Sequence, residues 1–243
     1  MEAHSGGSDR ERRERAFLFS VAVFSALIVV TGFGLRVVNG ETSFTGFPWW
    51  FHVHAIPMAS WIALVVAQSW LAWKGNMSLH RQLGWIGAAL AILMVVVGWF
   101  FTPATGAFRV SEGAEPTLDY VTFLLVNICN ITMFGLMVLA AVLVRRRTEW
   151  HRRLMLVATI LVVIVAWFRV MGLAGLEGEA QFQATRIATF VHFGFGIAGD
   201  WVIRGRPHPA WFIGIAAIIV NFFLARSLAS SPIGEALANA IMR

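Results

Sequence analysis

The sequence has 243 residues, of which 58% are hydrophobic and only 13% are charged. Soluble globular domains carry about 25% charged residues, so this composition excludes both a water-soluble fold and a disordered chain. The net charge of +6 comes from short basic clusters between apolar runs, which is typical of membrane-protein loops and not of a nucleic-acid-binding patch. The lone cysteine, Cys129, excludes a disulfide, a Cys-x-x-Cys redox motif and c-type haem attachment.

Seven apolar runs in the sequence are each long enough for a membrane-spanning helix, which needs about 20 mostly apolar residues. The first run is too long for a cleaved signal peptide and is expected to remain as a signal anchor. Pro48 and Pro116 precede the second and fourth runs, and Pro103 is expected to close the third. In chain order, the predicted spans are residues 16–38, 49–73, 83–103, 119–145, 153–174, 184–203 and 209–229.

These runs predict an all-α integral membrane protein, with one bundle of seven transmembrane helices over residues 16–229. Basic residues gather in the tail 1–15 and in the loops after the second, fourth and sixth spans, whereas the alternate loops carry glutamates. The positive-inside rule therefore places the N-terminus in the cytoplasm and the short C-terminal tail, 230–243, outside a bacterial inner membrane. The basic residues that set this orientation are Arg10, Arg12, Arg13, Arg15, Lys74, Arg81, Arg145, Arg146, Arg147, Arg152, Arg153, Arg204 and Arg206.

The connectors before the third and fifth spans repeat one pattern, an apolar residue followed by His-Arg-x-Leu. The first copy occupies residues 79–83 and the second residues 150–154, with His80 and His151 at equivalent positions. The pattern indicates two helical hairpins in parallel orientation after a lone first helix. We interpret the His-Arg pairs as membrane-interface anchors and topology signals.

Several polar residues fall inside the predicted spans, where ionisable groups are costly and therefore point to function. All of them are expected in the outer half of the membrane, where converging helices would form one polar cluster. The alternative for the asparagines is interhelical hydrogen bonding, and for Arg169 it is contact with the outer headgroups. For His54 the alternative is a hydrogen bond to a carbonyl near the interface, and for His192 it is a hydrogen bond to a neighbouring helix. The candidate residues are His54, with Met58 one turn further on, Asn127, Asn130, Arg169, Arg186 and His192.

The connector motifs and the segment 205–209, Gly-Arg-Pro-His-Pro, resemble those of bacterial inner-membrane proteins of unknown function. More distantly, His54 with Met58 four residues later, followed by a histidine-bearing helix, is similar to the hairpin of cytochrome b561-like di-haem proteins. That resemblance implies that His54 is an axial ligand of haem b. His192 is then its expected partner, because His80 and His151 lie at helix starts.

Three functions are compatible with these residues. The first is a haem-b electron carrier or oxidase-associated factor, in which His54 and His192 ligate the iron, Met58 and Arg169 tune it, and a quinone or respiratory complex is the partner. The second is a cofactor-free binding or transport protein that holds a small anionic or quinone-like ligand through Arg169, Arg186 and the two asparagines. The third is a structural or assembly subunit. Asp200 is the one acidic residue well inside a predicted span, so enzymatic acid–base chemistry is not expected.

Overall fold

The structure is a computed structural model that describes residues 3–40 and 48–242, with side chains from Asp9 onward. Helices account for most of this part of the chain, which contains no strand. The first helix, α1 (Ala3–Val29), continues through a π-helical turn, η1 (Val30–Gly34), into α2 (Leu35–Val38). The helices that follow are α3 (Trp49–Lys74), α4 (Met77–Ser111), α5 (Leu118–Leu143), α6 (Thr148–Leu173), α7 (Gly178–Arg204), α8 (Pro209–Ala229) and α9 (Pro232–Ile241).

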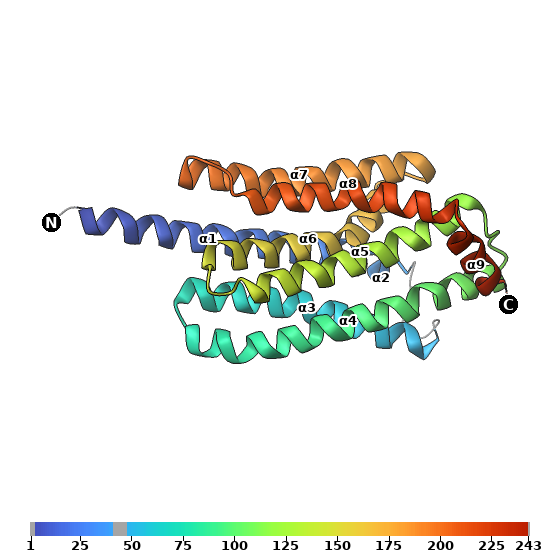
Figure 1. Cartoon of the computed structure of the whole chain (residues 1–243), viewed down its shortest axis with the longest axis horizontal. Coiled ribbons are helices and arrows are strands. Elements are labelled where there is room, and N and C mark those ends of the chain that lie inside the picture. The colour runs from blue at the N-terminus through green and yellow to red at the C-terminus, as the bar shows by residue number, and fades with distance from the viewer. Residues whose placement is uncertain (1–2, 41–47, 243) are drawn as a thin grey trace.

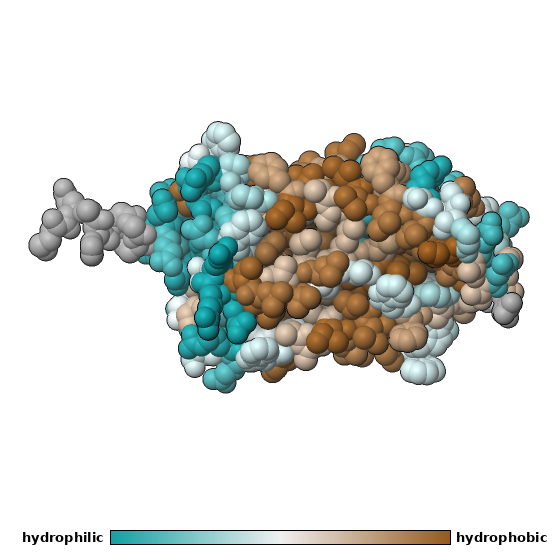
Figure 2. Space-filling model, viewed as in Figure 1, coloured by the Kyte–Doolittle hydropathy of each residue, from teal (hydrophilic) through white to brown (hydrophobic). Residues whose placement is uncertain are grey.

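Six helical segments are long and apolar enough to cross a membrane: α1 with η1 and α2, then α3, α4, α5, α6 and α8. Figure 2 shows a broad apolar band around the middle of the visible face, with hydrophilic residues at both ends. This is the surface of a multi-pass membrane protein. The seventh predicted span, residues 184–203, corresponds to α7, which has 27 residues but a more polar sequence and is not among the six.

The long helices run side by side in three layers (Figure 1). One outer layer holds α7 and α8, the other holds α3 and α4, and α1, α5 and α6 lie between them. The beginning of α1 and the turns α3–α4, α5–α6 and α7–α8 meet at one end, which we call the basic end because the arginine-rich loops lie there. The opposite end, where α9 packs against α4, α5 and α8, is the far end.

Small residues bring the layers into close contact. A Cβ atom added to Gly196 of α7 would lie 2.8 Å from the Trp211 ring of α8, and one added to Gly199 would collide with Phe17 of α1. Glycine at these positions therefore makes room for two aromatic side chains of neighbouring helices, which is the usual role of small residues in membrane bundles. The most buried helix is α6, whose Val157, Ile160 and Leu161 are fully enclosed.

The helices cover the predicted apolar runs almost completely, but α4, α6 and α7 begin five or six residues before them, and the prediction differs from the structure in three further respects. The expectation that Pro103 closes the third helix is wrong, because α4 continues to Ser111. Proline removes a single N–H donor, and the hydroxyls of Thr102 and Thr105 donate to the carbonyls of Gly98 and Phe101 beside the interruption. In addition, α1 begins well before residue 16, and the C-terminal tail contains α9.

Candidate functional site

His54 and His192 lie in different layers of the bundle. His54 is on α3, where its ring stacks on Phe101 of α4 with the ring centres 3.8 Å apart. His192 is on α7 and fully buried, and its Nε2 lies 3.2 Å from the Ser25 hydroxyl of α1. The helix α1 packs against both α3 and α7 and lies between the two outer layers (Figure 1).

This arrangement does not fit a haem held between the two histidines. The Nε2 of His192 is engaged by Ser25, and the Phe24 ring packs edge-on against the same imidazole at 4.9 Å. One face of the His54 ring is covered by Phe101. Met58, expected to tune the iron, packs against the apolar core instead. A haem held by both histidines would have to displace α1, which packs against α3 and α7.

The two asparagines make packing contacts. Asn127 donates to the carbonyl of Phe123 in its own helix, at 2.8 Å. Asn130 is buried and donates across to the carbonyl of Leu161 on α6, also at 2.8 Å. Hydrogen bonds of this kind join neighbouring helices in membranes. The geometry therefore matches the interhelical alternative for Asn130, whereas the hydrogen bond of Asn127 stays within α5.

Arg169 occupies a cationic site near the far end of the bundle. Its guanidinium lies over the Phe33 ring of η1, 4.4 Å from the ring centre, and its Nε is buried without a hydrogen-bond partner. Its strongest electrostatic neighbours are Arg36 of α2 and Arg109 of α4, and His54 is also within range. We call these residues, Phe33, Arg36, His54, Arg109 and Arg169, the far-end arginine site.

A π-helical turn and the lack of carboxylate partners among the described residues define this site. The π-helical turn η1 widens the helix where Gly32 touches the backbone of α6, and it aims the Phe33 ring at Arg169. Such turns occur frequently at functional sites. Among the described residues, no carboxylate pairs with Arg169 or Arg109. The site therefore has cations from three helical segments, and its most enclosed guanidinium has no carboxylate partner in the part of the chain that the structure describes.

Arg186 does not belong to this site. It pairs with Glu179 of its own helix at 3.3 Å and lies over the Phe222 ring of α8. The six polar residues expected to converge therefore separate into distinct places. Of these six, His54 and Arg169 are electrostatic neighbours, and they lie beside two arginines, Arg36 and Arg109, that the sequence reasoning did not include.

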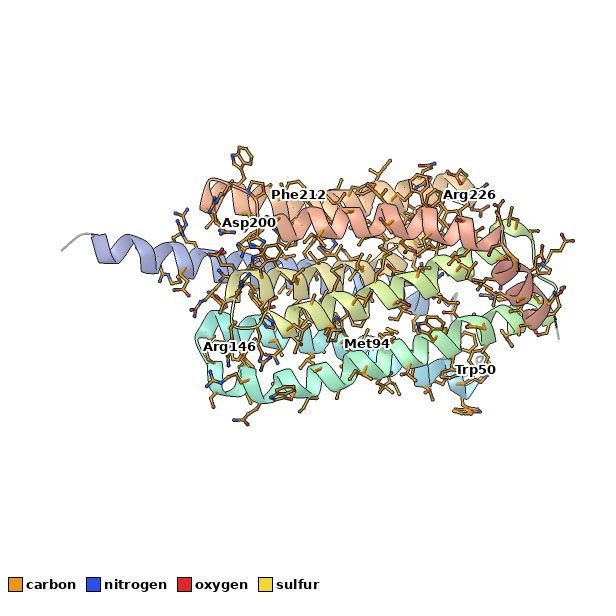
Figure 3. The ribbon with its side chains drawn as sticks, viewed as in Figure 1. Trp50, Met94, Arg146, Asp200, Phe212 and Arg226 are labelled. Atoms are coloured by element: carbon orange, nitrogen blue, oxygen red, sulfur yellow. The ribbon has the colours of Figure 1, made fainter. Side chains whose placement is uncertain are left out.

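The basic end holds a buried ion network that the sequence analysis also missed. Arg153 of α6 is fully buried; its Nε donates to Asp200 of α7 at 2.8 Å, and its guanidinium also contacts Glu14 of α1. Trp211 donates to the same Asp200 carboxylate at 2.8 Å, and so does the backbone N–H of His208 at 3.1 Å. Figure 3 shows Asp200 at the end of the bundle that also holds Arg146. In the sequence, the one sign of this network was Asp200, the acidic residue inside a predicted span.

The carboxylates of this network are paired with arginines of the protein itself, which is typical of a structural role. Each oxygen of Asp200 has a donor, and Arg152 and Arg204 add further ion pairs to Glu14 and Glu149. Burial, together with Arg153 and Arg204, lowers the pKa of His208 to about 4, so this ring stays neutral at pH 7. Paired buried charges of this kind are typical of contacts that fix how neighbouring helices pack.

Comparison of the chain with protein-family models, with curated proteins and with solved structures found no match.

Proposed function

We propose that this protein is a seven-span protein of the bacterial inner membrane, with its N-terminus in the cytoplasm, that binds a small anionic ligand at the far-end arginine site. The ligand chemistry is a carboxylate or phosphate group held by Arg169, with Arg36 and Arg109 as neighbouring cations. In this proposal α7 is the remaining span, because it lies alongside α8 over its length (Figure 1).

The observation that carries the proposal is the buried, unpartnered Nε of Arg169. An unpaired guanidinium in an apolar bundle costs free energy, whereas carboxylates and phosphates accept two parallel hydrogen bonds from it. Phe33 covers one face of this cation, and the N–H donors point outward in the plane of the guanidinium, where an anion would accept hydrogen bonds from them. A charge kept in an apolar bundle without a partner is a functional residue by default.

The other two functions have less support. For a haem protein, His54 and His192 lie in separate layers with their rings covered by Phe101 and Phe24. For a purely structural subunit, Arg169 would be expected to have a protein partner, as Arg153 has in Asp200. Arg153 has an acidic partner, whereas Arg169 on the same helix has none among the described residues. This difference favours a ligand-binding role for Arg169.

The test is a ligand-induced thermal shift of the protein, purified in a neutral detergent. The probes are inorganic phosphate, succinate and short-chain phosphatidylglycerol, with short-chain phosphatidylcholine as the zwitterionic control. At a concentration 100 times its dissociation constant, a bound ligand stabilises the folded state by about 2.7 kcal/mol. We expect at least one anionic probe to raise the melting temperature of the parent and not of Arg169→Met. A response to phosphatidylglycerol alone identifies a lipid headgroup as the ligand, and a response to phosphate or succinate identifies a soluble anion.

Arg186→Met is the matched control, because Arg186 is also cationic but has Glu179 as its partner. It should keep the parental shift, and so should His192→Ala. An unchanged melting temperature of the parent with every anionic probe would contradict the proposal. A sharp b-type haem spectrum after reduction, lost in both His54→Ala and His192→Ala, would replace it with the haem function.

A further inference from the structure

The two copies of the His-Arg connector place their histidines together at the basic end. His80 lies in the first turn of α4 and His151 in the first turn of α6, and their ring centres are 6.4 Å apart with the planes nearly perpendicular. The two rings come from helices that start at the same end of the bundle (Figure 1). The sequence repeat is therefore also a spatial pair.

Each ring is held by the same kind of hydrogen bond. His80 Nδ1 lies 3.2 Å from the carbonyl oxygen of Gln68, and the Gln68 side chain donates back to the His80 carbonyl. His151 Nδ1 lies 2.9 Å from the carbonyl oxygen of Ala141. A carbonyl oxygen accepts hydrogen bonds and cannot donate, so each Nδ1 carries the proton. In the neutral ring, Nε2 then presents its lone pair.

Both lone pairs remain free. No hydrogen bond of the described residues uses Nε2 of either ring, and neither atom is among the buried unpartnered ones, so solvent reaches both. A histidine that donates Nδ1–H to a backbone carbonyl and offers Nε2 has the arrangement found in metal-binding histidines. An interface anchor would not require the same tautomer at both positions.

We infer that His80 and His151 bind one transition-metal ion of the class that prefers imidazole, with zinc as its representative. With Zn–N bonds of about 2.0–2.1 Å, two rings on one tetrahedral ion have their centres about 5.3 Å apart. The observed 6.4 Å between the ring centres is about 1 Å longer, so both side chains would turn towards the ion as it binds. The site is at the basic end and is therefore independent of the far-end arginine site.

The remaining ligands would be water or an anion from solution. The described residues contain no group of three or more His, Cys, Asp or Glu side chains that could hold a metal, so the protein supplies two ligands. Arg81 and Arg145 are electrostatic neighbours of the pair. Their charge weakens the affinity for a dication and attracts an anionic ligand to the open positions. We therefore expect a site of moderate affinity.

The test is a calorimetric titration of the tag-free, full-length protein in detergent with Zn²⁺ alone. His80→Asn and His151→Asn are the informative variants, because the asparagine amide can keep the bond made by Nδ1 while Nε2 is removed. We expect one Zn²⁺ per chain in the parent and at least about tenfold weaker binding in each variant. His52→Asn, at the far end, is the matched control and should bind as the parent does.

A second measurement identifies the ligands. With Cu²⁺ as the probe, electron paramagnetic resonance of the parent should show coupling to two imidazole nitrogens, and each single variant should lose one. Absence of binding in the parent, or parental affinity in both asparagine variants, would overturn the inference. Unchanged melting temperatures of the variants without metal would show that lost binding does not reflect misfolding.

Discussion

Two arginines of α6 lie in opposite electrostatic surroundings. Arg153 has Asp200 and Glu14 as partners, whereas Arg169 has an aromatic ring and further cations. The same residue type on one helix should therefore have effects of opposite sign when its charge is removed. In the proposed function, the charge of Arg153 serves packing and the charge of Arg169 serves ligand binding. The sign of the stability change on removing each charge distinguishes the two roles.

Replacing Arg169 by methionine should stabilise the ligand-free protein. Methionine keeps most of the length of the side chain and removes a charge that repels Arg36 and Arg109, so we expect a gain of about 1 kcal/mol. The melting temperature is measured by tryptophan fluorescence, in detergent without added anions. A clear loss of stability would indicate that Arg169 has a structural role, against the proposed function.

Replacing Arg153 by methionine should destabilise the protein strongly. The change leaves Asp200 and Glu14 buried without their main partner, and breaking a buried pair in this way costs about 3–5 kcal/mol. The same melting experiment measures the effect. The double variant Arg153→Met, Asp200→Leu should recover part of the loss, because no unpaired aspartate remains.

At the level of elements, the contact between η1 and α6 sets how closely the first helix approaches the bundle. A Cβ atom on Gly32 would lie 2.6 Å from the carbonyl oxygen of Ala166, a backbone atom that cannot move alone. Gly32→Ala should therefore separate the two helices and cost about 1–3 kcal/mol of stability. Gly194→Ala is the control: nothing lies within 4 Å of its added Cβ, so helix propensity should leave the stability equal or higher. Equal melting temperatures for both variants would contradict the close contact.

The start of α8 should make stability depend on pH. His208 caps this helix by accepting the Ala210 N–H on Nδ1 at 3.2 Å, which requires a neutral ring. Its pKa falls from 6.5 to about 4 on folding, so between these values the unfolded chain binds more protons. The neutral His208 ring therefore contributes its full stabilisation of the folded state above about pH 6.5. This contribution to the free energy of unfolding decreases as the pH falls towards 4, by up to about 1.4 kcal/mol per pH unit.

The variant His208→Asn isolates this effect. Asparagine also caps helices well but does not titrate, and the carboxylates of the ion network titrate in both proteins. The difference in melting temperature between parent and variant should therefore change between pH 7 and pH 4.5. A constant difference over this range would show that the ring does not control the cap.

The sequence predicts helices well here because a span is a local property. Apolar runs and turn residues place α3, α5, α6 and α8 within a few residues of their observed bounds. The partners of polar residues depend on which helix faces lie together, and seven runs of similar hydrophobicity do not encode that order. For this reason the convergence of Arg36 and Arg109 on Arg169 was not predicted, and neither was the pairing of Glu14 with Arg153.

At the scale of the whole molecule, the fold determines which loops lie on the same side of the membrane. The α5–α6 and α7–α8 turns lie at the basic end, and the α4–α5 and α6–α7 connections lie at the far end (Figure 1). The proposed topology therefore places Arg146 and Arg206 on the cytoplasmic side, and Ala114 and Glu177 outside. An experiment can decide whether α7, which is not among the six apolar helical segments, crosses the membrane.

Single cysteines in a Cys129→Ala background answer this question with a membrane-impermeant maleimide. We expect Ala114→Cys and Glu177→Cys to react in intact cells, and Arg146→Cys and Arg206→Cys to react only after permeabilisation. Glu177 and Arg206 flank α7, so opposite labelling of these two positions means that the helix crosses. The same labelling for both would remove α7 from the spans. Reaction of Arg146→Cys in intact cells, with Ala114→Cys protected, would instead reverse the orientation and place the far-end arginine site on the cytoplasmic side, where its anion would have to come from the cell interior.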